Sequence, residues 1–186
     1  MAIMILGLII FVGIHLIPAL QPLRKQLFLI LGERGYKAAF SIVALTGLVL
    51  IVIGKSKSDI LPLYQTIDGA NAITTLFMFI AVFGIVASHR RSNLKRFTAH
   101  PMSWGIICWA IGHLIANGDV ASVILFTVFL CYSLFAIWSA NSRGQKPSAS
   151  GSVVSLKHDL FNAALSVAAF TLLATTHEYY TGVPLI

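Results

Sequence analysis

Long uncharged stretches of mainly apolar residues alternate with short polar connections along nearly the whole chain. Each stretch approaches or exceeds the roughly 17–25 residues that a helix needs to cross the hydrocarbon core of a membrane. We therefore expect an all-helical (all-α) integral membrane protein, a six-helix bundle that occupies residues 1–186 as a single transmembrane domain. The expected spans are Ala2–Pro22, Ala38–Gly54, Gly69–Ser88, Phe97–Gly118, Val120–Ser142 and Leu160–His177.

Two of the connections predict local structure of their own. Pro22 and the following run Leu23–Leu31 are typical of a short helix that lies at the membrane interface, and Gly32 should end it. The turn Asn117–Asp119 is the shortest connection in the chain. The fourth and fifth spans should therefore form an antiparallel pair.

The composition agrees with a protein embedded in lipid. Hydrophobic residues make up 58% of the chain and charged residues only 10%, whereas roughly 25% of the residues in a soluble domain are charged. Membrane lipid is thus the expected partner of most of the surface, and six spans leave no room for a separate soluble domain. We expect a multi-pass protein of the cytoplasmic (inner) membrane.

The positive charges lie almost entirely in alternate connections. The first, third and fifth connections hold four, four and three Lys or Arg residues, which is eleven of the thirteen in the chain. This alternation is the positive-inside pattern, with both termini outside and the three basic connections in the cytoplasm. The net charge of +7 therefore sets the orientation in the membrane and does not indicate nucleic-acid binding.

Two histidines lie within the long apolar stretches, six or more residues from any charged side chain. At about 1.5 Å per residue, His15 and His113 lie roughly 9 and 18 Å from the cytoplasmic face of the hydrocarbon core. An ionisable group at this depth is costly unless it is paired or bound to a metal, so both are candidate functional residues. The other four lie near the ends of spans, where they can stay hydrated: His89, His100, His158 and His177.

Two readings of His15 and His113 stay open at this point. Each could form a hydrogen bond with a polar side chain of a neighbouring helix, in a membrane scaffold without a cofactor. Alternatively, both could bind one metal centre. Zinc normally requires three or four protein ligands, whereas the iron of haem requires only one or two because the porphyrin supplies the others. No Cys-x-x-Cys-His sequence is present, which excludes the usual covalent attachment of c-type haem.

The neighbours of the two histidines are compatible with a flat apolar group. Phe11 lies one helical turn before His15, and Trp109 lies one turn before His113. Gly105, on the same face of its span, would allow close approach of a helix or a macrocycle. The propionates of a haem would need cations at the cytoplasmic interface, and the candidates are Arg24, Arg34 and Arg96.

Several segments resemble the NnrU family of small membrane proteins and, through it, the related zeta-carotene cis–trans isomerases. The stretches that carry the resemblance are Phe11–His15 followed by Leu23–Arg24, Gly32–Lys37 leading into Phe40, His100–Met102 with Trp109 and His113–Leu114, and Leu134–Trp138. The His-Pro pair at His100, with a second histidine thirteen residues later, is the most specific of them. Together these segments reach across most of the chain.

The resemblance implies a b-type haem with histidine axial ligands, and the family's ligands correspond to His15 and His113. His100 resembles a further histidine of the family. The isomerase has a cysteine near its second ligand, but Ala110 stands at the matching position here. That difference argues against an isomerase-like exchange of iron ligands.

NnrU proteins are associated with nitrogen-oxide metabolism and with the ability to make or use nitric oxide reductase. We therefore expect a haem protein that supports nitric oxide or denitrification metabolism, with a redox partner or a small hydrophobic or gaseous ligand. A haem-dependent isomerase of a hydrophobic polyene and a scaffold without a cofactor are the alternatives. The sequence leaves open whether the protein is an enzyme.

Overall fold

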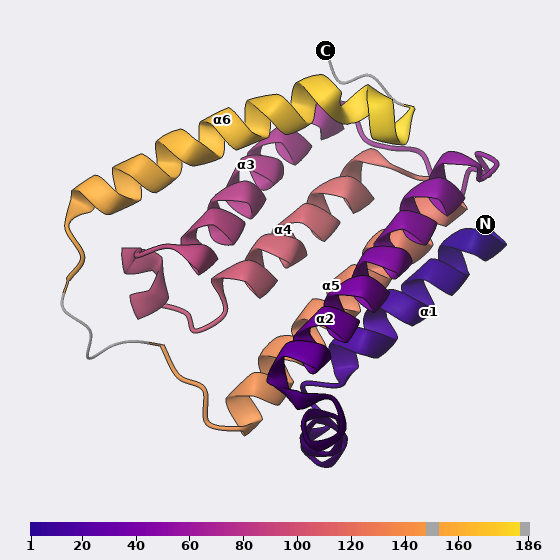
Figure 1. Cartoon of the computed structure of the whole chain (residues 1–186). Coiled ribbons are helices and arrows are strands. Elements are labelled where there is room, and N and C mark those ends of the chain that lie inside the picture. Colours follow the sequence, from indigo (N-terminus) through magenta and orange to yellow (C-terminus); the bar gives the residue numbers. More distant parts are fainter. Residues whose placement is uncertain (148–152, 183–186) are drawn as a thin grey trace. The chain divides into compact units, whose positions relative to one another are not determined.

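The computed structural model describes residues 1–147 and 153–182, and within these ranges the regular elements are helices (Figure 1). The six α-helices are α1 (Ala2–Leu16), α2 (Gln21–Ser56), α3 (Ala70–His89), α4 (Pro101–Ala116), α5 (Val120–Ser142) and α6 (Leu156–Thr181), and a short 3₁₀-helix η1 (Asn93–Arg96) precedes α4. The expected all-helical class is confirmed, and the described residues form the expected six α-helices, of which four are long and apolar enough to cross a membrane. Contacts divide the chain into an N-terminal unit, Met1–Ile60 with Tyr180–Gly182, and a C-terminal unit that begins at Leu61.

The N-terminal unit is built on close contact between α1 and α2. A Cβ atom added at Gly7 would lie 2.6 Å from the backbone nitrogen of Ile51, and one added at Gly47 would lie 2.8 Å from that of Phe11. Real Cβ atoms do not approach other atoms so closely. These glycines therefore let the two helix backbones meet, as small residues do in membrane helix pairs.

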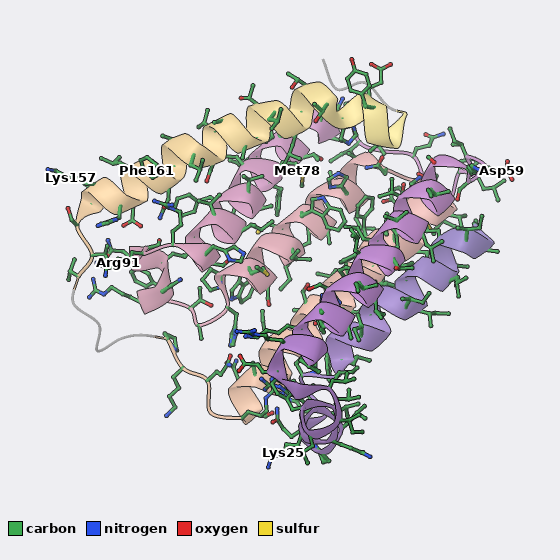
Figure 2. All side chains as sticks on the ribbon, in the orientation of Figure 1. Lys25, Asp59, Met78, Arg91, Lys157 and Phe161 are labelled. Atoms are coloured by element: carbon green, nitrogen blue, oxygen red, sulfur yellow. The ribbon has the colours of Figure 1, made fainter. Side chains whose placement is uncertain are left out.

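The helix predicted over Leu23–Leu31 is present, and it ends where expected, at Gly32. Gly32 has φ 67° and ψ 171° and interrupts the helical conformation inside α2. Glycine adopts such a positive φ without steric cost. In Figure 1 the segment before Gly32 is seen end-on, whereas the remainder of α2 runs across the view, and Lys25 marks this segment in Figure 2. Its side chains Leu29 and Ile30 are 87% and 69% exposed.

Several helix boundaries differ from the predicted ones. The first span was expected to reach Pro22, but α1 ends at Leu16, because Pro18 has no N–H to continue the helical hydrogen bonds. Residues 33–37, expected in a connection, are helical, and Lys37 forms an ion pair of 2.5 Å with Glu33 one turn earlier on this helix. The fourth span was expected from Phe97, whereas α4 begins at Pro101 after η1.

In the C-terminal unit, α4 packs against α3 on one side and α5 on the other. Gly84 and Gly105 bring α3 and α4 into backbone contact, because an added Cβ would lie 2.8 Å from the Pro101 oxygen or 2.7 Å from the Ala81 oxygen, respectively. The turn between α4 and α5 spans only residues 117–119. The expected antiparallel pair is confirmed.

The segment before α3 is held against the α4–α5 turn. The backbone nitrogens of Leu63 and Tyr64 donate to the oxygen of Gly118, at 2.7 and 3.1 Å, and Pro62 forms an isolated β-bridge with Asp119. The Tyr64 hydroxyl donates to the carbonyl oxygens of Leu114 and Asn117. The second and fourth connections therefore meet at one end of this unit.

A network of hydrogen bonds joins the third connection to the start of α6. Asp159 accepts from the Ser92 hydroxyl at 2.8 Å and from the Asn93 backbone nitrogen at 3.1 Å. Arg90 donates to the side-chain oxygen of Asn162 at 3.0 Å, and its guanidinium lies over the ring of Phe161. Figure 2 labels Phe161 at this end of the unit. Asn93 also exchanges hydrogen bonds with the Val154 backbone, so the third and fifth connections meet each other at the opposite end of this unit.

Candidate functional site

His15 lies in the last turn of α1, and its ring has one defined orientation. The Nδ1 atom is 2.7 Å from the backbone oxygen of Phe11. Because a carbonyl oxygen only accepts, Nδ1 must carry the proton and donate. The Nε2 atom of this tautomer then carries the basic lone pair. The imidazole stacks on the Phe11 ring at 4.1 Å and meets the edge of Phe40, from α2, at 5.0 Å.

His113 repeats this arrangement in the C-terminal unit. It lies in the last turn of α4, and its Nδ1 donates to the backbone oxygen of Trp109 at 2.9 Å. The ring lies 5.1 Å from that of Trp109 and stacks on Phe126, from α5, at 4.5 Å. Asn117 donates to the His113 carbonyl oxygen through both its backbone and its side-chain nitrogen. This end of α4 is therefore firmly held.

The shared arrangement has a clear chemical meaning. When Nδ1–H donates to a backbone carbonyl, the imidazole is fixed in the neutral tautomer that presents Nε2, and its basicity rises. Metal-binding histidines in proteins are almost always oriented in this way by a second partner. Both predicted ligands, His15 and His113, have this orientation and have flat aromatic neighbours.

The remaining predicted site residues lie elsewhere. His100 precedes the first residue of α4, at the end opposite to His113, and its Nε2 is 2.7 Å from the side-chain oxygen of Asn141 on α5. Arg34 lies two residues after the break at Gly32 and is exposed. Trp109 contacts His113 as expected and also packs edge-on against Phe126 and Phe129.

The cysteine thiols add no group to the predicted site residues. Ala110, at the position of the isomerase cysteine, is completely buried, and Cys108 is partly buried two residues earlier on α4. Within residues 1–147 and 153–182, no three His, Cys, Asp or Glu side chains gather as a metal site. That observation concerns metal ions held by protein ligands alone, whereas haem needs one or two such ligands.

Three aromatic residues near the histidines were not assigned a role from the sequence. Phe40 and Phe126 reach the imidazoles from neighbouring helices, and Tyr36 lies next to Phe40 in α2 with ring centroids 6.3 Å apart. Phe40 and Tyr36 belong to one of the segments that carry the family resemblance, and this was the available signal for them.

By length and composition, α2, α3, α5 and α6 are able to cross a membrane, which makes the chain an all-helical, multi-pass membrane protein. The family model described as NnrU protein matches residues 3–185, so the chain belongs to the NnrU family. This confirms the resemblance found in the sequence. No curated protein and no solved structure matches the chain.

Proposed function

We propose that this NnrU protein binds one b-type haem in the cytoplasmic membrane, with His15 and His113 as axial ligands, and supports nitric oxide or denitrification metabolism. The observation that carries the proposal is that the two histidines have the same tautomer and the same hydrogen bond. In each, Nδ1 donates to the carbonyl oxygen four residues earlier, so the lone pair that a haem iron would use is on Nε2.

The surroundings of the histidines fit a porphyrin better than a bare ion. Each imidazole has two aromatic rings within 5.1 Å, and flat apolar side chains pack well against a macrocycle. Bound haem would supply one-electron redox chemistry and an iron able to bind a small gas. The protein's own contribution would be to fix both imidazoles in one tautomer and to exclude water from them.

The role in nitric oxide metabolism rests on family membership. A haem-dependent isomerase of a hydrophobic polyene is less well supported, because the side chain at position 110 is a buried alanine that cannot bind iron. A ligand exchange of the kind attributed to the isomerase would need another donor. A redox partner or a gaseous ligand fits the proposed role.

The first test is the absorption spectrum of the detergent-purified protein, oxidised and dithionite-reduced. We expect a Soret band and sharp α and β bands on reduction, as six-coordinate haem gives. His15→Ala and His113→Ala should each lose or broaden these bands. His158→Ala, which changes an exposed histidine at the start of α6, serves as the control and should leave them unchanged.

Two results would contradict the proposal. A colourless wild-type protein, after expression with ample haem, would exclude the cofactor and favour a scaffold. Unchanged bands in both variants would reject the ligands but keep the haem. The metabolic role is tested separately by deleting the gene: nitric oxide consumption should fall, and the wild-type gene but not the His113→Ala gene should restore it.

A further inference from the structure

One buried hydroxyl group in the N-terminal unit has no hydrogen-bond partner. Tyr36 is 8% exposed, and its hydroxyl, like that of Ser122 in the C-terminal unit, finds no acceptor or donor among the described residues. Buried tyrosine hydroxyls usually have a partner, and leaving one unpaired costs about 1–3 kcal/mol. The Tyr36 hydroxyl therefore points to a polar group that the described residues do not supply.

Tyr36 stands in a line of contacts that ends at His15. Its ring lies 6.3 Å from that of Phe40, and the Phe40 ring lies 5.0 Å from the imidazole of His15. In the other direction, the Tyr36 ring lies 4.4 Å from Phe28, and the Arg24 guanidinium lies over the Phe28 ring at 5.4 Å. The phenol of Tyr36 and the cation of Arg24 thus lie one after the other on the path from His15 to the interfacial segment.

This sequence of groups matches one part of a haem bound at His15. The iron would lie at the imidazole, while the two propionates extend from one edge of the porphyrin and carry negative charge. A carboxylate accepts a hydrogen bond from a phenol and is stabilised by a nearby guanidinium. Arg24 belongs to the interfacial segment, where such a group would meet the polar region of the membrane.

We propose that the Tyr36 hydroxyl donates a hydrogen bond to a haem propionate and that Arg24 supplies the neighbouring positive charge. The inference rests on the proposed function, because it requires haem at His15. It adds a second anchor, at the carboxylate edge, to the anchor at the iron. The anchor is specific for a carboxylate-bearing porphyrin, since an esterified edge presents no anionic acceptor.

The test measures how fast haem leaves the purified protein for an excess of apomyoglobin. Tyr36→Phe removes only the hydroxyl and keeps the ring between Phe28 and Phe40. We expect the variant to lose haem about tenfold faster or more, the factor that a lost hydrogen bond to a charged group corresponds to. Tyr179→Phe is the matched control, because Tyr179 is 90% exposed, and it should release haem at the wild-type rate.

Reconstitution with haem dimethyl ester identifies the acceptor. The ester lacks the negative charge and keeps only neutral carbonyl oxygens as acceptors, so the difference between wild type and Tyr36→Phe should be much smaller with the ester than with haem. A difference as large with the ester as with haem would overturn the proposal and indicate that the hydroxyl meets a lipid headgroup or a water molecule. Equal rates with unmodified haem would also overturn it.

Failure of this inference is distinguishable from failure of the proposed function. If wild type binds haem and Tyr36→Phe behaves like it, only the anchor at Tyr36 is rejected. If wild type binds no haem, both proposals fail. Should Tyr36→Phe not accumulate, wild type alone decides, because equal release of haem and its dimethyl ester would exclude a propionate anchor.

Discussion

A histidine within a helix tilts toward the helix N-terminus, so its Nδ1 can reach the carbonyl oxygen four residues earlier. Both His15 and His113 use that bond. The residue that supplies the carbonyl is aromatic in each case, Phe11 or Trp109, and its ring also contacts the imidazole. One aromatic residue therefore sets both the tautomer and one face of the ring.

The side chain of Tyr64 holds the end of α4 that carries His113. Its hydroxyl donates to the carbonyl oxygens of Leu114 and Asn117, in the last turn of α4 and just beyond it. Tyr64→Phe should lower the free energy of unfolding by about 1 kcal/mol, the typical net value of one hydrogen bond. Thermal unfolding in detergent at neutral pH measures the difference.

The same residue predicts a pH dependence. Partial burial, together with the negative charge of Asp119, raises the pKa of the Tyr64 phenol above its usual value of 10.0. The protonated phenol is the donor, so its stabilisation is complete below about pH 10 and is lost as the pH rises through the higher pKa of the folded protein. Wild type should therefore lose more stability than Tyr64→Phe between pH 9 and pH 11; parallel curves would contradict this assignment.

At the residue level, the sequence predicted the contacts made within a helix and missed those made between helices. Phe11 and Trp109 were expected beside the histidines because they lie four residues earlier on the same helix. Phe40 and Phe126 come from α2 and α5, and their contacts depend on how far one helix is shifted along the next. The missing partner of Tyr36 could not be predicted, since burial is a property of the packed helices.

At the scale of the helices, contacts at glycine residues determine how closely two helices pack. The first helix offers a matched comparison. A Cβ at Gly7 would clash with the backbone of α2, whereas a Cβ at Gly13 would meet nothing within 4 Å. Both glycines belong to α1 and lie six residues apart.

Gly7→Ala should force α1 away from α2 and lower the unfolding free energy by about 1–3 kcal/mol, as overpacking does. Gly13→Ala should be neutral or raise it by up to about 1 kcal/mol, because alanine favours helix more than glycine. The melting temperatures of the two purified variants test this. Equal destabilisation by both substitutions would mean that the close contact at Gly7 does not hold the pair.

The order and number of helices followed from the alternation of apolar stretches and polar connections, because lipid solvates only continuous apolar helices well. Their ends did not follow from it. The first stretch was expected over Ala2–Pro22, whereas α1 is Ala2–Leu16, and α4 is likewise shorter than its apolar stretch. At 15 and 16 residues these helices measure about 22 and 24 Å, less than the roughly 30 Å of the hydrocarbon core. They are also the two that carry His15 and His113.

At the scale of the whole molecule, the connections of the C-terminal unit form two groups. The third and fifth connections, both basic, are joined by the hydrogen bonds between Asn93 and the Val154 backbone. The second and fourth, which together carry only two basic residues, are joined through Pro62 and Gly118. Odd-numbered and even-numbered connections therefore lie at separate ends of this unit, which is the arrangement that a positive-inside orientation requires.

That orientation predicts which exposed residues a membrane-impermeant maleimide can reach in intact cells. In a background with both native cysteines replaced by serine, Asp59→Cys in the second connection should be labelled without permeabilisation. Lys25→Cys and Lys157→Cys, in the first turns of α2 and α6, should be labelled only after the membrane is opened. The side chains at all three positions are exposed, and Figure 2 gives their names. The reverse labelling pattern would mean that the protein has the opposite orientation, with both termini in the cytoplasm. Labelling of all three positions in intact cells would reject a multi-pass arrangement with alternating loops.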